Sequence, residues 1–301
     1  MEVSDINKIL SQFDLSQIQE ITLECNPQNI EEKYIQKLSE TQINRVSLGA
    51  QSFLDSELDL LGRLHNSEQI SRAFELIRNQ GFNNISLDLI YGLPNQKMLN
   101  VLFSLEKVIE INLEHVSLYC LSLEENVSLF SKKHLIPSDD AISDFYHLIR
   151  TKLISSDFKQ YEISNFAKQG FESKHNLCYW SDKHYLGFGP SAAGYFENTR
   201  YTNPADLEEY FNQIGTSKIF QNLENLNEFD HEKEFIFLSL RRTKGMNLKE
   251  FEYKFQKDFL EKYRKTVDKY LKNKFIEIED EFIKLAPKAY FISNEIFSEL
   301  M

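Results

Sequence analysis

Segments with two different spacings of apolar residues alternate along the first two-thirds of this chain. Short runs rich in apolar residues predict strands, and longer stretches with apolar residues three or four positions apart predict helices between them. The predicted strands cover residues 20–25, 44–49, 84–90, 115–121 and 160–165. The predicted helices cover residues 29–40, 55–61, 67–80, 97–111 and 138–156.

The regular alternation of strand and helix favours parallel strands joined by right-handed crossovers. Five such units in succession predict a barrel or partial barrel rather than a two-layer fold. The element boundaries carry local signals as well. Asn66 and Gln69 are typical of a helix start, and Gly81 is typical of a helix C-cap just before the third strand.

The pattern changes after the last of these units. It weakens over 197–230, which predicts a connection, and it becomes helix-rich from residue 231, with a long Lys-rich helix ending near residue 273. A β-hairpin is predicted at 275–286 and a last helix from about residue 292. We therefore expect a barrel-like domain over 1–196, a connection, and a small winged-helix-like domain over 231–301.

Charge narrows the functional classes. The net charge is −12, whereas residues 241–274 carry 12 Lys/Arg against 5 Asp/Glu, a balance of +7 that leaves −19 for the rest. A basic winged helix is able to bind nucleic acid, but mixed charges are also typical of a solvated amphipathic helix. We favour the second interpretation and expect no nucleic-acid partner, because the acidic remainder repels phosphates.

Cysteine usage and the first residues of the chain indicate its compartment. The cysteines are Cys25, Cys120 and Cys178, with no CxxC pair, which fits a reduced, cytoplasmic protein better than a disulfide scaffold. The first 17 residues are polar and acidic, unlike a signal peptide. No apolar run approaches the length of a membrane span.

Polar residues occupy the carboxyl ends of the predicted strands, where function gathers in parallel β/α architectures. Glu24 lies in the first strand, Gln51 follows the second, and Asp88 lies in the third. If these three residues lie together at one rim of the barrel, they are able to accept hydrogen bonds from ribose hydroxyls or an amine. Arg63 is able to pair with a carboxylate through two parallel hydrogen bonds. Each residue also has a structural interpretation: a helix cap for Glu24, half of a buried salt bridge for Asp88, and a surface position for Arg63.

The stretch 161–194 is the densest in groups that a simple core does not need, with YEISNFA, HNLCYW and YLGFGPSAAG in succession. His175, Cys178 and His184 are candidate metal or haem ligands, and Tyr179 and Trp180 are able to pack against a flat ligand. The alternative is structural, since an HN pair can cap a turn and a Tyr-Trp pair is often core. From the residues alone, the choice among these three candidate ligands stays open.

Seven motifs taken in chain order carry a family resemblance: ITLECNP, NRVSLGAQSF, LLGRLH, DLIYGLP, HVSLYCLSLEE, YEISNFA and HNLCYW–YLGFGPSAAG. They resemble the radical S-adenosylmethionine proteins related to oxygen-independent coproporphyrinogen III oxidase, and above all the HemW branch, the haem chaperones. The resemblance covers about residues 20–195, and the C-terminal winged-helix-like unit resembles the family's too.

The resemblance implies a partial (β/α)6 barrel in which a [4Fe–4S] cluster, held by three cysteines spaced CxxxCxxC, binds S-adenosylmethionine. By position, the residues that resemble the S-adenosylmethionine contacts are Glu24, Gln51, Arg63 and Asp88. His175 resembles the histidine proposed to bind haem in the chaperone branch. Haem and haem-accepting proteins are the implied partners, and the cytoplasm is the expected compartment.

The chain departs from the family pattern at one point, because no CxxxCxxC occurs in it. We therefore expect a radical-SAM barrel that lacks its first one or two β/α units and that has no electron source for reductive cleavage of S-adenosylmethionine. An open barrel edge of this kind invites pairing with another chain, including a second copy.

Three functions remain open at this point. The first is a haem chaperone-like protein that binds haem for transfer, without radical chemistry in this form. The second is oxygen-independent coproporphyrinogen III oxidation, which the HNLCYW motif favours less. The third is a barrel fragment that serves only protein contacts or has no function.

Overall fold

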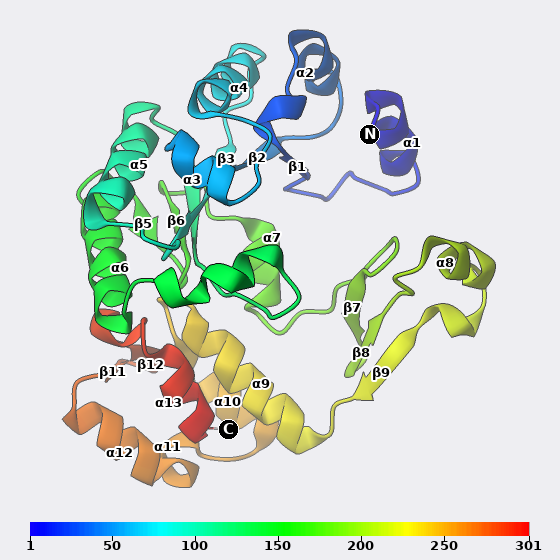
Figure 1. The fold of residues 1–301 in the computed structure, drawn as a ribbon. Coiled ribbons are helices and arrows are strands. Elements are labelled where there is room, and N and C mark those ends of the chain that lie inside the picture. The colour runs from blue at the N-terminus through cyan, green and yellow to red at the C-terminus, as the bar shows by residue number, and fades with distance from the viewer. Residues whose placement is uncertain (301) are drawn as a thin grey trace. The chain divides into compact units, whose positions relative to one another are not determined.

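The computed structural model describes residues 1–300, which divide into two compact units (Figure 1). The division falls between Lys174 and His175. The first unit contains the strand–helix alternation, and the second contains a small sheet followed by the helix-rich region. The division lies earlier in the chain than the boundaries at residues 196 and 230 that the sequence pattern suggests.

The first unit is built on one six-stranded sheet with the order β1-β2-β3-β4-β6-β5. Its strands are β1 (Thr22–Cys25), β2 (Arg45–Gln51), β3 (Ile85–Tyr91), β4 (His115–Cys120), β5 (Lys159–Gln160) and β6 (Asn165–Ala167). The first four strands run parallel, and Leu48 of β2 lies level with Leu87 of β3. Consecutive strands are therefore neighbours, as the alternating pattern predicts.

Helices follow the parallel strands and lie around the outside of the sheet (Figure 1). They are α1 (Val3–Leu10), α2 (Glu32–Ser39), α3 (Asp55–Leu60), α4 (Ser67–Asn79), α5 (Met98–Glu110) and α6 (Asp139–Ile154), with 3-10 turns η1 (Pro27–Asn29) and η2 (Ser128–Leu135). Both predicted boundary signals are confirmed. Asn66 and Gln69 form a reciprocal capping box at the start of α4, and Gly81 follows its end with φ +88°. Within residues 1–300, no helix combines the length and apolar character needed to cross a membrane.

The prediction of a fifth parallel strand at 160–165 is wrong. Residues in this stretch form a tight reversal between β5 and β6, which pair antiparallel with Gln160 opposite Phe166. The Glu162 carboxylate fixes the reversal, because Oε1 accepts hydrogen bonds from the backbone N–H of Ser164 and from Asn165 Nδ2. Strand β6 then pairs antiparallel with β4, so the parallel part of the sheet ends at the fourth strand.

The two faces of the parallel strands differ in polarity because side chains alternate along a strand. Leu48 and Leu87 share one face and are fully buried. Ser47, Asp88 and Ser117 share the opposite face, where Asp88 lies level with Ser117 on the next strand. One face of the sheet therefore forms the apolar core, and the other presents polar side chains.

A buried hydrogen-bonded chain crosses the polar face near the amino ends of the strands. The His115 imidazole pairs with Ser86 Oγ at 2.7 Å through Nδ1 and with the Tyr161 hydroxyl at 2.8 Å through Nε2. Complete burial, followed by the positive charge of Arg45, holds the pKa of His115 well below its usual value of 6.5. The imidazole is therefore neutral in the folded protein near neutral pH.

The second unit begins with α7 (Lys174–Tyr179), whose residues from His175 onward belong to it, and a three-stranded antiparallel sheet. That sheet consists of β7 (Ala193–Phe196), β8 (Thr199–Thr202) and β9 (Gln221–Asn225), with α8 (Leu207–Gln213) and a 3-10 turn η3 (Ser217–Ile219) between the last two strands. The stretch 197–230, for which the sequence suggests a connection, thus contributes two strands and a helix. Strand β9 is mostly exposed and rich in Asn and Glu, so its sequence lacks the alternation of apolar and polar residues that indicates a strand.

The helix-rich region has the helix–helix–hairpin order that the sequence predicts. Its elements are α9 (Glu228–Arg241), β10 (Met246–Asn247), α10 (Leu248–Phe255), α11 (Phe259–Lys262), α12 (Arg264–Lys272), β11 (Ile276–Glu279), β12 (Phe282–Leu285), a 3-10 turn η4 (Pro287–Ala289) and α13 (Ser293–Leu300). The hairpin and the last helix are confirmed.

The single Lys-rich helix predicted to end near residue 273 is wrong. Gln256 adopts a left-handed conformation with φ 54° and ends α10. Asp258 then caps α11 by accepting a hydrogen bond from the backbone N–H of Glu261. Two short helices, α11 and α12, therefore occupy the residues after α10 for which the sequence predicts one long helix.

Glu232 on α9 anchors these short helices from inside the unit. Its side chain is fully buried and accepts hydrogen bonds from Lys257 at 2.9 Å, Lys262 at 2.5 Å and the Tyr263 hydroxyl at 2.6 Å. Burial alone would raise the pKa of this carboxyl, but the bonds from Lys262, Tyr263 and Lys257 lower it overall. The carboxylate is thus ionised and links α9 to the segment that follows α10.

We predict that His115 makes the first unit less stable in mild acid. The unfolded chain binds a proton at His115 near pH 6.5 and the folded chain does not. Protonation at His115 therefore leaves the free energy of unfolding unchanged above pH 6.5 and lowers it below that pH. Below that pH it falls by up to about 1.4 kcal/mol per pH unit. Urea unfolding at pH 7.5 and 5.5 should show a smaller pH-dependent loss in His115→Gln than in the wild type. The exposed-residue control His147→Gln should keep the wild-type dependence, and equal losses in all three proteins would contradict the prediction.

We predict that Glu232→Gln lowers the free energy of unfolding of the second unit by about 3 kcal/mol, because it leaves two lysines without their buried counter-charge. Glu228→Gln is the matched control. Glu228 also pairs with Lys257, at 2.7 Å, but it is 72% exposed, so its loss should cost less than about 1 kcal/mol. Urea unfolding of both variants measures the difference, and equal costs would refute a buried anchor.

Candidate functional site

The structure places two of the predicted rim residues, Glu24 and Gln51, near the carboxyl ends of β1 and β2. Glu24 on β1 lies level with Ser47 of β2 and is exposed. Gln51 is the last residue of β2, where it is buried and has a positive φ of 71°. Asp88 lies in the middle of β3, and Arg63 follows α3 in the next turn.

Asn26 brings two of these residues together. Arg63 Nη1 donates to Asn26 Oδ1 at 3.4 Å, and the Gln51 amide folds back over Gly49 on the same side. A Cβ at Gly49 would lie 2.9 Å from Gln51 Nε2 and 3.5 Å from Asn26 Oδ1, so a larger residue there would displace the end of the Gln51 side chain. The structure therefore adds Asn26 to the candidate site, and its position directly after ITLEC is the sequence signal that could have indicated this role.

Glu24 and Asp88 form the electrostatic part of the site. The pKa of Asp88 is raised from 3.8 to about 6, chiefly by burial and to a smaller extent by the negative charge of Glu24. Hydrogen bonds from Ser117 and Ser47 and the positive charge of Arg45 act in the opposite direction. Asp88 is therefore ionised at neutral pH but poorly solvated, which makes it a strong acceptor for an N–H or O–H group of a ligand.

A buried polar network supports the chain directly after Gln51 and the turn after β3. The Glu57 carboxylate accepts from Ser52 Oγ at 2.6 Å and from Gln96 Nε2 at 3.1 Å. The Gln96 carbonyl in turn accepts from the backbone N–H of Gly92 at 2.7 Å. The sequence does not indicate this network, because nothing distinguishes Glu57 from an ordinary residue of a short predicted helix.

His175 lies on α7 and contacts Tyr179 one helical turn later. The two rings meet edge to face, with centroids 4.6 Å apart and planes at 85°. Trp180 follows, and the Arg241 guanidinium lies over its ring at 4.5 Å. His184 instead contacts the rings of Tyr195 and Phe196. The two histidines thus contact different rings, although Tyr185 links Tyr179 to Tyr195.

No three metal-ligating side chains gather anywhere within residues 1–300. Cys25 lies at the end of β1, where burial and then the charge of Glu24 raise the pKa of its thiol to about 11. Cys120 ends β4 and Cys178 lies on α7. The residues described here therefore do not supply the three thiolates of an iron–sulfur cluster.

A cavity of about 230 Å³ lies within the second unit beside the aromatic residues of the HNLCYW region. Its lining comprises Tyr179, Trp180, Asp182, Lys183, Tyr185, Tyr195, Arg200, Glu234 and Leu238. Pockets that enclose small ligands usually measure roughly 300–1,000 Å³, so this cavity is too small to enclose a porphyrin. A flat macrocycle bound near His175 would have to lie outside it.

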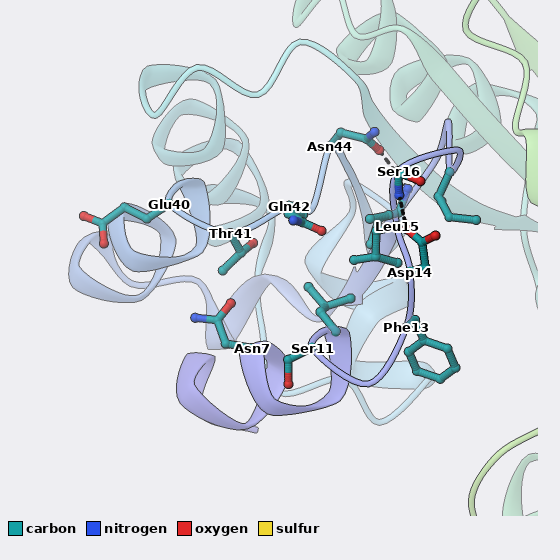
Figure 2. A pocket seen from close by; sticks show the side chains of 13 residues that line it. Asn7, Ser11, Phe13, Asp14, Leu15, Ser16, Glu40, Thr41, Gln42 and Asn44 are labelled. Carbon is teal, nitrogen blue, oxygen red and sulfur yellow. Dashed lines mark hydrogen bonds between the residues drawn. The ribbon is translucent and has the colours of Figure 1, made fainter.

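A groove of about 790 Å³ in the first unit (Figure 2) lies at the amino ends of the strands. It is lined by residues of α1, by the segment that follows α1 and by the loop before β2, including Phe13, Thr41 and Asn44. Asn44 directly precedes β2 and binds the backbone N–H of Ile21 through Oδ1. Because ligands of parallel β/α folds bind at the carboxyl ends, this groove is not the candidate site.

Comparison with known proteins identifies the family. The Radical SAM superfamily model matches residues 2–107, and the HemN C-terminal domain model matches residues 226–292. The haem chaperone HemW of Lactococcus lactis is 34% identical over 98% of this chain and 79% of its own length. The chain belongs to the HemW family of radical S-adenosylmethionine proteins. HemW of Bacillus subtilis is 32% identical over the same shares.

The solved structures show the same fold. Coproporphyrinogen III oxidase (HemN) of Escherichia coli superimposes with a TM-score of 0.84 over 99% of this chain and 73% of its own, at 21% identity. The predicted resemblance and fold class are therefore confirmed: a radical-SAM α/β domain with a parallel sheet, followed by a HemN-type C-terminal domain. The roles of Glu24, Gln51, Arg63, Asp88 and His175 stay predictions.

We predict that opposite substitutions move the Asp88 pKa in opposite directions. Ser117→Ala removes a hydrogen bond that favours the ionised form and should raise the pKa above 6, whereas Glu24→Gln removes a like charge and should lower it. Carboxyl ¹³C NMR titration of the wild type and both variants measures the shift. A pKa unchanged by both substitutions would show that the two groups do not control the ionisation of Asp88.

Proposed function

We propose that this protein binds haem and delivers it to acceptor proteins in the cytoplasm. The observation that carries the proposal is the likeness to proteins named haem chaperone HemW, which extends over 98% of the chain in two of them. A neutral imidazole is a good axial ligand for haem iron. His175 is exposed on α7 and has aromatic neighbours at 179 and 180, which supports its role as that ligand.

We also propose that the carboxyl ends of β1, β2 and β3 hold S-adenosylmethionine. This ligand carries ribose hydroxyls, an ammonium group and a carboxylate. Glu24 and Asp88 suit the hydroxyl and ammonium donors, and Arg63 suits the carboxylate. The proximity of Arg63 to Gln51 through Asn26 supports the assignment. We assign no radical step to these residues.

The similarity to coproporphyrinogen III oxidase, at 21% identity, establishes a common fold and gives no ground for assigning porphyrinogen decarboxylation to this chain. A haem-carrying role needs a surface ligand for iron and does not need a buried site for a tetrapyrrole substrate. We therefore retain haem binding as the function that these observations support best.

We predict that His175→Ala weakens haem binding by at least about tenfold, because loss of one coordinate bond to iron should cost more than about 1.4 kcal/mol. Titration with ferric haem, followed by the Soret band, measures both the affinity and the change of ligand. His134→Ala is the matched control, since His134 lies on an exposed turn of the first unit.

A second variant, His184→Ala, separates the two histidines of the 175–184 segment. It should bind haem as the wild type does. Loss of binding in His184→Ala together with unchanged binding in His175→Ala would move the proposed ligand to the other histidine, and an unchanged spectrum in both would reject axial ligation from this segment.

A further inference from the structure

Three segments of the second unit line its cavity of about 230 Å³. The turn after α7 supplies Trp180 and Asp182, and helix α9 supplies Glu234 and Leu238. The third segment is the antiparallel sheet with the residue that bridges to it, and it supplies Tyr185, Tyr195 and Arg200. All these residues belong to the second unit, so that unit builds the cavity by itself.

Three polar atoms in this lining are buried and have no hydrogen-bond partner among the described residues: Trp180 Nε1, Asp182 Oδ1 and Glu234 Oε2. A buried polar atom without a partner is unfavourable and uncommon in folded proteins. The indole nitrogen needs an acceptor, whereas each carboxylate oxygen needs a donor. Because the three residues line one cavity, a molecule inside it is in a position to supply the missing bonds.

Each of the two carboxylates already has a cation at its other oxygen. The Asp182 side chain is 4% exposed, and its Oδ2 accepts from Lys254 and pairs with His231 Nε2 at 2.9 Å. Burial alone would raise the pKa of Asp182, but the hydrogen bonds from His231 and Lys254 lower it overall. Glu234 pairs with Arg200 through Oε1. The remaining oxygens therefore belong to carboxylates held as anions, which favours a positively charged donor over an anion.

Aromatic rings of the same lining suit a small cation. Tyr185 and Tyr195 have ring centroids 6.3 Å apart, and Tyr195 is buried. Burial, followed by the negative charge of Asp182, raises the pKa of the Tyr195 hydroxyl, so this carboxylate and this side chain are neighbours. The faces of aromatic rings attract cations. The rings therefore add to the preference of the two carboxylates for a positively charged group.

The volume of the cavity limits the size of its occupant. One molecule of liquid water takes up about 30 Å³, so a cavity of about 230 Å³ has room for a small organic molecule. The unpartnered atoms require a molecule with several donor hydrogens and an acceptor. A primary ammonium group supplies the donors, and a hydroxyl or carboxylate oxygen on a short carbon spacer supplies the acceptor.

We propose that this cavity binds a small primary ammonium compound that also carries an oxygen acceptor, namely an amino alcohol or a small amino acid. The ammonium group donates to Asp182 Oδ1 and Glu234 Oε2, and the oxygen accepts from Trp180 Nε1. The proposal is independent of haem binding, because the site uses neither iron nor the imidazole of His175.

Trp180 is the only tryptophan of the chain, so its fluorescence reports on the lining of this cavity. Titration of the full chain with ethanolamine and with glycine should give a saturable change. Ethylene glycol and acetate, which lack the ammonium group, should give none at the same concentrations. These two pairs of probes have similar sizes, so the comparison isolates the positive charge.

Glu234→Gln tests the charged acceptor and keeps the shape of the side chain. It should weaken the binding of both amines by at least about tenfold, the loss expected for one hydrogen bond to a charged group. Glu228→Gln is the matched control, since Glu228 lies on the same helix and is exposed, and it should bind both amines as the wild type does. Trp180→Phe removes the indole N–H and should weaken binding about two- to tenfold in calorimetric titration.

Lys183 distinguishes the two sources of the ammonium group, because it lines the cavity and is exposed. Weaker binding of glycine but not of ethanolamine in Lys183→Ala would identify an amino acid, whose carboxylate pairs with the lysine. Tighter binding of ethanolamine than of glycine, with no effect of Lys183→Ala, would identify an amino alcohol. Both results support the ammonium site.

Three results would overturn the proposal. The first is an unchanged Trp180 fluorescence with both amines, which would leave only water in the cavity. The second is wild-type affinity in Glu234→Gln, and the third is binding of acetate or ethylene glycol as tight as that of the amines. Should near-UV circular dichroism show that Glu234→Gln is misfolded, Leu238→Phe decides: it fills the cavity, so undiminished binding of the amines would reject the site.

Discussion

The two-residue period of the parallel strands is the constraint on which the first unit depends. It places Leu48 and Leu87 in the core and leaves Ser47, Asp88 and Ser117 on the other face of the same strands. A desolvated carboxylate is unfavourable in itself, and two serine hydroxyls and a guanidinium offset part of that cost. The candidate site therefore follows from the strand period together with the hydrogen bonds that this period aligns.

The rim needs a second support, because strand ends alone do not fix loops. Glu57 and Gln96 provide it, since they link the chain after β2 to the turn after β3 through buried hydrogen bonds. A fully satisfied buried network of this kind rigidifies its surroundings, whereas a half-satisfied one destabilises them. The site residues are thus held by groups that never need to touch a ligand.

Most of the first unit was predictable from sequence because its strands are buried on one face and its helices carry capping signals such as Asn66 and Gly81. The errors have a common physical origin. Glu162 turns the chain by a side chain-to-backbone contact, and Gln256 ends a helix in a left-handed conformation without being a glycine. Neither the contact of Glu162 nor the conformation of Gln256 alters the spacing of apolar residues from which the elements were predicted. The position of Asn26 directly after β1 indicates a place near the strand ends, but its contact with Arg63 was not predictable, since it depends on how two loops meet.

The two candidate sites rest on different kinds of support, and this has a chemical consequence. Asp88 is controlled by charge and desolvation, so its behaviour depends on pH and on nearby hydroxyls. His175 instead packs against the ring of Tyr179, which in turn contacts Tyr185. The supports share no residue and lie in separate units. A substitution that changes the ionisation of Asp88 should therefore leave the contact between His175 and Tyr179 intact.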